Sequence, residues 1–448
     1  MSVKIDVHCH LLQADAVERE SFLRAWLGLN DVPNYVVKWV ADIVLSGALN
    51  SVHTLTTLLR PWVGGEAHDL ACQLKNAGSQ FWPTFSLPHQ AMAPVLLSAY
   101  EEEEVDLFVP LMTDYEEWLE GDPKWFVWRP SPATGHAECR VEWKKQVIFE
   151  NGGRIHPFAP FCPLRAAAHD IETEVAKVVG LVESDGFIGV KLYPLMGYYP
   201  CGNADKCKDK WLPPGLRAYG ATYARIDLAL DKLYAACEAA EIPITAHCSP
   251  QGARGPHGSN KNDHSTKNQA HPLNWADVLA KYPNLRLNLG HMAGDHFQTL
   301  SKKELNTEAD WAFQIAGLMD AHPFVYADRS IQLPPPKQDA RKRAKYAKRL
   351  FHVLGLNPTV PKRMMNGTDW HLALMYGEED EWREANARFR EILANHPNPD
   401  LAGWFFGENA ADFLGLRPGG ANRARLERYY RDTLHLAEAD FPAWWSKV

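Results

Sequence analysis

Short apolar runs alternate with helical patterns along the chain, most regularly from residue 155 onward. The runs have the length of buried strands, and one of them, 186–194, ends at a proline. Between the runs lie segments such as 225–241, whose apolar residues recur at three- and four-residue spacing, as in an amphipathic helix. Two further helices are predicted at 166–184 and 274–283. The predicted strands are the opening segment, which ends in His8 and His10, and 105–114, 155–161, 186–194, 242–248, 284–294, 322–330 and 363–370.

This alternation predicts an α/β fold with an all-parallel sheet covered on both faces. Eight strands favour a closed (β/α)8 TIM barrel as a single domain, residues 1–416. An open doubly wound sheet is the alternative, but the sequence has no G-x-G-x-x-G loop to recommend it. Large insertions follow strands one, two and five. In a barrel, the segments that follow the strands form the catalytic face. The first insertion, 11–104, is expected to be helical, and residues 417–448 are expected to form a helical tail.

The first strand carries two histidines separated by one residue, in the segment DVHCH. Successive side chains of a strand point to opposite faces, so His8 and His10 share one face. Two imidazoles on one face form half of a divalent-metal site. Such a pair also occurs in ordinary buried strands, so the rest of the chain must decide.

Four more ionisable residues stand at the ends of predicted strands. Strand four carries Lys191, strand five ends at His247, strand six at His291 and strand eight at Asp369. Taken by itself, each histidine would be an ordinary core or surface residue with its hydrogen bonds made. The aspartate would be part of a turn or the cap of a helix. The carboxyl ends of barrel strands converge on one mouth, and a metal site there explains the whole set at once.

With these residues at its strand ends, the chain resembles the amidohydrolase superfamily of metal-dependent barrels. The resemblance is strongest to its amidohydrolase-related branch, which includes aminocarboxymuconate-semialdehyde decarboxylase and many predicted metal-dependent hydrolases. The matching segments occur in the order of the family and span most of the chain. They are DVHCH, GVKLYP, TAHCS, HPLNWADVLAKYPNLRLNLGHMAG, NGTDW and GENAADFLGL.

The resemblance implies that His8, His10 and His247 bind a divalent metal ion, with zinc favoured. Asp369 would be a further ligand or a base beside a metal-activated water. His291 would act as a proton shuttle, or as a ligand if a second ion is present. One ion is favoured over two, because this branch is mostly mononuclear.

Lys191 has two possible roles under this resemblance. It would be a metal ligand only if it is carboxylated and bridges two ions. Uncarboxylated, its ammonium could hold a substrate carboxylate or pair with an acid of the pocket. Arg329, Tyr193 and Arg254 are further candidates for contact with an anionic substrate.

The function implied is hydrolysis, in which a metal-activated water attacks an amide, ester, lactone or related carbonyl of a small, anionic substrate. The alternative is a non-oxidative, metal-dependent decarboxylase acting on a small carboxylic acid, because the residues of the metal site do not separate the two reactions. A barrel that serves only as a binding protein is disfavoured, since unused imidazoles and carboxylates are costly to hold together.

Composition and charge limit the binding partners and the environment expected for this protein. A net charge of −8 argues against a nucleic-acid partner, and the basic segment 334–349 reads as a solvated outer helix. The apolar stretch 39–59 is interrupted by polar residues, which favours a buried or amphipathic helix over a membrane span. Eight cysteines without a C-x-x-C pair, and no visible leader, predict reduced thiols in a cytoplasmic protein. A homo-oligomer is possible.

Overall fold

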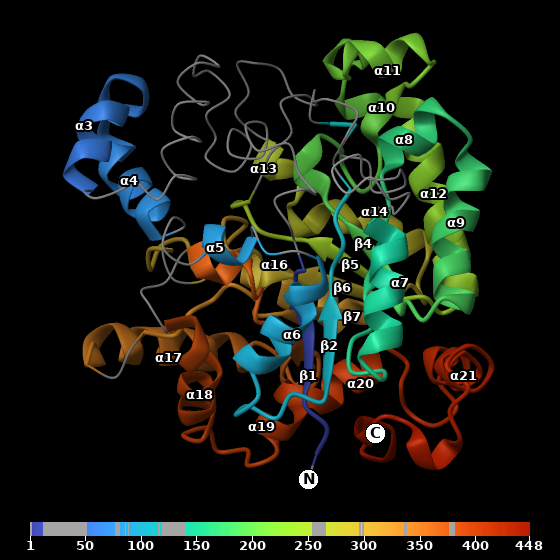
Figure 1. The fold of residues 1–448 in the computed structure, drawn as a ribbon. Helices are drawn as coiled ribbons and strands as arrows, with labels where there is room; N and C mark the ends of the chain where they lie inside the picture. Colours follow the sequence, from blue (N-terminus) through green and yellow to red (C-terminus); the bar gives the residue numbers. More distant parts are fainter. Residues whose placement is uncertain are drawn as a thin grey trace.

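The structure of the protein is a computed structural model that describes most of the chain. Within the described residues, parallel strands run through the centre and helices surround them (Figure 1). The described ranges are 2–11, 52–76, 81–85, 87, 89–114, 117–118, 140–252, 266–294, 297, 300–335, 338–375 and 381–448.

The strands form two hydrogen-bonded sheets, and every pair is parallel. β1 pairs with β2, and β3 to β8 pair in chain order. All the strand residues are buried, as expected for strands covered on both faces. The strands are β1 (Ile5–Cys9), β2 (Leu107–Pro110), β3 (Phe158–Pro160), β4 (Gly189–Leu192), β5 (Ile244–His247), β6 (Leu287–Gly290), β7 (Val325–Asp328) and β8 (Met364–Met365).

Backbone contacts join the two sheets at both seams. Between β2 and β3, single parallel bridges link Phe108 to Ile155 and Leu111 to Phe158. On the other side, Val7 N donates to Asn366 O at 3.1 Å, so the chain after β8 returns to β1. The architecture is the predicted α/β TIM barrel, with continuous pairing inside each sheet and isolated contacts at the seams.

Helices follow most of the strands and cover the outside of the barrel. In Figure 1, α7, α9 and α12 lie on one side of the strands and α17 and α18 on the other. The described helices of the predicted first insertion are α3 (Val52–Val63), α4 (Ala67–Asn76), α5 (Trp82–Phe85) and α6 (His89–Ala99). The later ones are α7 (Arg140–Glu150), α8 (Pro163–Ala168), α9 (Ile171–Ser184), α10 (Asn203–Lys206), α11 (Pro214–Ala218), α12 (Tyr223–Ala239), α13 (Thr266–Gln269), α14 (Ala276–Lys281), α16 (Trp311–Ala321), α17 (Ala340–Leu354), α18 (Glu381–Leu393), α19 (Leu401–Gly403), α20 (Asn409–Phe413) and α21 (Ala421–Arg428).

The segment 166–184, predicted as one helix, is two helices in the structure. α8 ends at Ala168, and Asp170 begins α9 by accepting a hydrogen bond from Thr173 N at 2.7 Å. An aspartate at this position satisfies a backbone N–H of the first turn, which favours a new helix start over a continuous helix. By contrast, the predicted helix 225–241 is confirmed as α12.

The last segment of the chain packs on the barrel at the opposite end from the candidate site. His156 Nε2 lies 2.6 Å from the Tyr430 hydroxyl, and Trp444 donates to Gly153 O at 2.9 Å. Both termini lie at this lower end in Figure 1. The division into a barrel and a tail at residue 416 stays a prediction.

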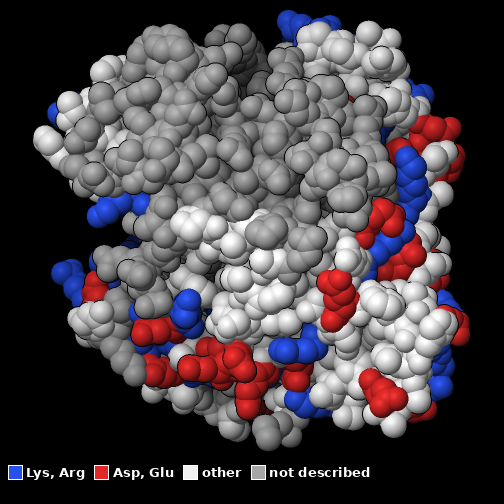
Figure 2. All heavy atoms as spheres, in the orientation of Figure 1, with Lys and Arg blue, Asp and Glu red and all other residues white. Residues whose placement is uncertain are grey.

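The described surface mixes charges of both signs. Figure 2 shows basic and acidic side chains next to one another on one face, with acidic side chains gathered along its lower part. The described cysteines are all free thiols. None of the helices described here is both long and apolar enough to cross a membrane.

Candidate metal centre

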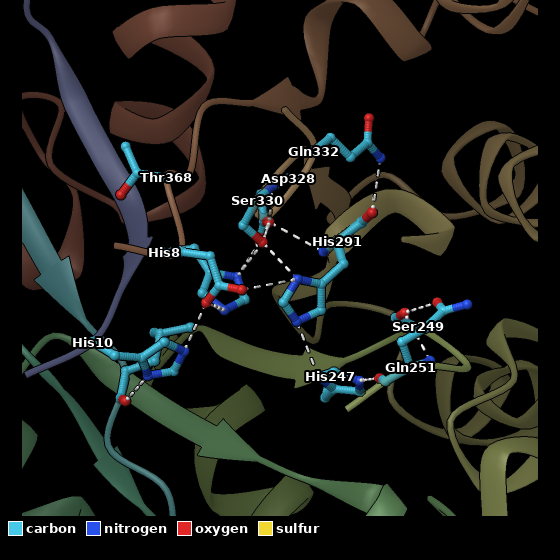
Figure 3. A network of polar contacts seen from close by, with 12 residues as sticks. His8, His10, His247, Ser249, Gln251, His291, Asp328, Ser330, Gln332 and Thr368 are labelled. Carbon is cyan, nitrogen blue, oxygen red and sulfur yellow. Dashed lines mark hydrogen bonds and ion pairs between the residues drawn. The ribbon is translucent and has the colours of Figure 1, made fainter. Parts of the chain in front are cut away.

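The carboxyl ends of the strands bring the predicted ionisable residues into one buried region, and Figure 3 shows the histidines among them. β1 contains the first histidine of the pair, and the second directly follows that strand. β5 ends at a histidine, and another directly follows β6. These buried residues are His8, His10, Lys191, His247, His291 and Asp369.

His8, His10 and Asp369 form a compact group. Asp369 Oδ1 lies 3.0 Å from His10 Nε2 and 3.7 Å from His8 Nε2. One ligand atom from each of the three residues falls within 4.8 Å of the others, a separation that suits a shared cation. The sharing of a strand face predicted for the two histidines is therefore realised, with Asp369 as the third member.

The hydrogen bonds of His10 determine which of its nitrogens is free. His10 Nδ1 lies 2.8 Å from the carbonyl oxygen of Leu111, which can only accept, so this nitrogen carries the proton. Burial lowers the pKa of His10, against the opposing effect of Asp369, and favours the neutral ring. Nε2 is then unprotonated, and its lone pair faces the Asp369 carboxylate.

His247 and His291 form a second pair beside this group. His247 Nδ1 lies 2.9 Å from His291 Nε2, and His247 Nε2 lies 2.6 Å from the carbonyl oxygen of Gln251. Since that carbonyl requires a proton on Nε2, the Nδ1 of a neutral His247 is unprotonated. Burial and the neighbouring His291 hold the pKa of His247 well below its usual value, so the ring is neutral.

Asp328, at the end of β7, connects the two groups and was not predicted from the sequence. Its Oδ2 lies 2.9 Å from His8 Nδ1 and accepts from Asn288 Nδ2 at 2.7 Å. Its Oδ1 accepts from Ser330 Oγ at 2.5 Å and from His291 N at 3.1 Å. Figure 3 shows the Ser330 hydroxyl between the rings of His8 and His291.

Charged groups in this region have shifted pKa values. Burial alone would raise the pKa of Asp369, but the nearby His10 and His291 outweigh it and lower this pKa below its usual range. Burial lowers the pKa of Lys191 to about 8, against the opposing charges of Asp328 and Asp369. The carboxylate is therefore ionised at neutral pH, and the ammonium is held in a costly environment.

The backbone that carries His291 and Asp369 is unusual. Their φ angles are 71° and 54°, and Met292 and Ala293 follow at 42° and 73°. Residues with side chains rarely adopt this left-handed conformation, and where they do it often accompanies a functional site. Gly367 contributes differently, since a Cβ there would lie 2.6 Å from His8 Cβ and block the approach of the two segments.

Comparison with known proteins identifies the family. Residues 154–416, more than half of the chain, match the family model Amidohydro_2, described as amidohydrolase. The chain belongs to this amidohydrolase family. No curated protein matched the chain.

Several solved structures resemble this amidohydrolase in shape. An amidohydrolase from Burkholderia multivorans with bound zinc is 13% identical, with 92% of this chain and 99% of that chain covered and a TM-score of 0.46. The 5-carboxyvanillate decarboxylase from Novosphingobium aromaticivorans, complexed with manganese and a nitrobenzoic acid, is 11% identical, with 92% and 96% covered and a TM-score of 0.49. A probable 2-pyrone-4,6-dicarboxylic acid hydrolase from Acinetobacter baumannii is 10% identical, with 72% and 88% covered and a TM-score of 0.40.

The donor atoms of the amidohydrolase fit a divalent cation. Among the residues that the structure describes, neither His8 Nε2 nor Asp369 Oδ2 has a hydrogen-bond partner, although both are buried. A lone pair of His10 faces the same carboxylate. Imidazole nitrogens and carboxylate oxygens are ligands that zinc and similar divalent ions take, and a cation would replace these unfavourable contacts with bonds.

Of the predicted substrate-contact residues, the structure brings one to the site and places another away from it. The Tyr193 ring lies 4.6 Å from the His247 ring, centroid to centroid, so the structure brings Tyr193 to the site. The Arg329 guanidinium is buried elsewhere, where it donates to Asn366 Oδ1 at 2.8 Å and to Gln332 O at 3.0 Å. Arg254 lies outside the described residues. Substrate contact by any of the three stays a prediction.

Proposed function

We propose that this amidohydrolase holds one divalent metal ion, with zinc favoured, and hydrolyses an amide, ester, lactone or related carbonyl of a small, anionic substrate. The observation that carries this proposal is the convergence of the Nε2 atoms of His8 and His10 on the Asp369 carboxylate in a buried site. When bound at such a site, a divalent ion polarises a carbonyl and lowers the pKa of a coordinated water toward neutrality. The proposed ligands are His8, His10, His247 and Asp369.

The residues around the proposed ligands supply proton transfer. Asp369 is ionised at neutral pH, so it is able to accept a proton from the attacking water as well as to hold a cation. His291 contacts Ser330 Oγ through Nδ1 at 2.8 Å and His247 through Nε2. A proton can therefore enter at one ring nitrogen and leave at the other, as a shuttle requires.

A metal-removal experiment tests the proposal. The purified protein is treated with a chelator, dialysed, and reconstituted with Zn²⁺ or Mn²⁺ before assay against esters, lactones, amides and aromatic carboxylic acids. We expect hydrolysis of one of the carbonyl classes that disappears with the metal and returns with it. Failure to retain any metal would overturn the proposal, and carbon dioxide release from an acid without hydrolysis would establish decarboxylation instead.

Lys191 is proposed to hold the anionic group of the substrate. Its ammonium is buried on β4 and has no hydrogen-bond partner among the described residues, a costly state that a bound carboxylate would relieve. Losing a hydrogen bond between charged groups corresponds to about a tenfold to hundredfold change in binding. We therefore expect Lys191→Met to raise KM for the anionic substrate by that factor and to change kcat less.

The control for this variant is Lys191→Arg, which keeps the positive charge and should recover part of the loss. Intact-mass and metal analysis complete the test. A carboxylated lysine together with two metal ions per chain would show that Lys191 is a ligand, and an unchanged KM would also contradict its proposed role.

A further inference from the structure

We infer that Asp328 is a positioning residue that fixes the ring of His8, with Nε2 presented to the candidate metal centre. The inference rests on the proposed metal site but concerns residues outside the ligand set. Ser330 and Asn288 belong to the same arrangement, since both donate hydrogen bonds to the Asp328 carboxylate.

The surroundings of Asp328 are built to hold a charged carboxylate in one orientation. The side chain is completely buried. Oδ1 receives the backbone N–H of Ser330 at 3.0 Å and that of His291 at 3.1 Å, together with the Ser330 hydroxyl. Oδ2 receives the Asn288 amide at 2.7 Å. A carboxylate that accepts this many hydrogen bonds stays ionised and cannot itself donate.

The tautomer of His8 follows from this environment. His8 Nδ1 lies 2.9 Å from Asp328 Oδ2 and 2.9 Å from Ser330 Oγ. Because Oδ2 only accepts, Nδ1 carries a proton, and Nε2, 3.7 Å from Asp369 Oδ1, is the nitrogen left for a metal ion. Carboxylate partners of this kind orient metal-binding histidines in general, and removing them weakens metal affinity by roughly 10–100-fold.

The same carboxylate also places His291. Its Oδ1 accepts the His291 backbone N–H, and Ser330 Oγ, which bonds to Oδ1, lies 2.8 Å from His291 Nδ1. Asp328 thus ties residues from β1, β6 and β7 into one buried unit. A ligand ring fixed in this way does not have to be ordered when a metal ion binds, which favours tight binding.

The test is the zinc affinity of Asp328→Asn, measured by competition with a chromophoric chelator and independent of activity. An amide nitrogen facing His8 would donate to Nδ1 and move the ring proton to Nε2, the nitrogen needed for the metal. We expect an affinity loss of about 10–100-fold. Nitrogen NMR of the metal-free protein with labelled histidine should show His8 changing from the Nδ1–H to the Nε2–H tautomer.

Asp310→Asn is the matched control. Asp310 is equally buried, but its partners are Arg349, at 2.5 Å, and the backbone N–H groups of Phe313 and Asn306. The Asp310→Asn variant should be less stable than wild type, while its zinc affinity stays within about twofold of the wild-type value. Ser330→Ala is a second variant, expected near the lower end of the same range, in case Asp328→Asn does not fold.

The outcomes separate this inference from the proposed function. If wild type binds no zinc, the proposed function fails. If wild type binds zinc and both variants bind it equally tightly, Asp328 has no positioning role and the inference alone fails. If wild type binds two zinc ions and Asp328→Asn loses one of them, Asp328 is a ligand, which also overturns the inference.

Discussion

Asp369→Asn is expected to reduce kcat by at least about a hundredfold while part of the metal stays bound, because a positioned proton acceptor contributes about 10²–10⁴ to a rate. The carboxylate is completely buried and faces the Nε2 atoms of His8 and His10. An amide has nearly the same shape but carries no charge and accepts no proton. Steady-state kinetics with metal analysis of the same sample separates the loss of rate from the loss of metal.

The control for Asp369→Asn is again Asp310→Asn, which removes a buried carboxylate charge away from the site. The assay is run well below the melting temperature of this variant, so that a loss of stability does not affect the rate. The kcat of Asp310→Asn should then remain close to that of wild type. An Asp369→Asn enzyme that kept its metal and turned over within twofold of wild type would show that this carboxylate has no part in the reaction.

The barrel was predictable because its signal is local. Each strand is a short apolar run, and burial on both faces makes such runs continuous rather than alternating. Element ends were less predictable. Predicted strand eight spanned 363–370, but β8 covers only Met364–Met365, and the chain after it turns away through the left-handed conformation of Asp369. The start of a second helix at Asp170 was likewise missed, although an aspartate before a helical pattern is a known start signal.

The candidate site was only half predictable. The ends of parallel strands meet at one mouth, and that rule was enough to gather the histidines and Asp369. The same rule applies to the end of strand seven, where Arg329 was selected as a substrate contact. Asp328, the last residue of β7, and Ser330, two residues beyond it, lie on either side of Arg329 in the sequence. The structure directs that pair toward His8 and the guanidinium away from it.

Asn288 shows why the hydrogen-bond partners around the candidate site could not be predicted from the sequence. It lies inside β6, and its amide reaches the Asp328 carboxylate across forty residues of chain. A buried asparagine in an apolar strand requires a partner, but the sequence does not say which. Partners of this kind depend on register and on side-chain direction, which only the folded barrel fixes. The candidate ligands were therefore accessible from the sequence, and the residues proposed to orient them were not.

His10→Ala and His247→Ala are expected to lose bound metal and activity together. Each of these two histidines has one nitrogen fixed by a carbonyl oxygen, Leu111 O for His10 and Gln251 O for His247, so that the other nitrogen is unprotonated. Removing either ring takes away one of about four metal ligands, and the remaining set binds far less tightly. Metal content after dialysis should fall to a small fraction of the wild-type value, and the residual rate should follow the residual metal.

His156→Ala provides the matched comparison for these two variants. His156 is also a fully buried histidine with both nitrogens engaged, by Gly186 O at 2.7 Å and by the Tyr430 hydroxyl, but it lies where the C-terminal segment packs on the barrel. Its removal should lower the melting temperature and leave metal content and rate per folded molecule unchanged. If all three variants lost metal equally, the loss would report damaged folding rather than missing ligands. Full metal and full rate in both His10→Ala and His247→Ala would instead exclude these histidines from the centre.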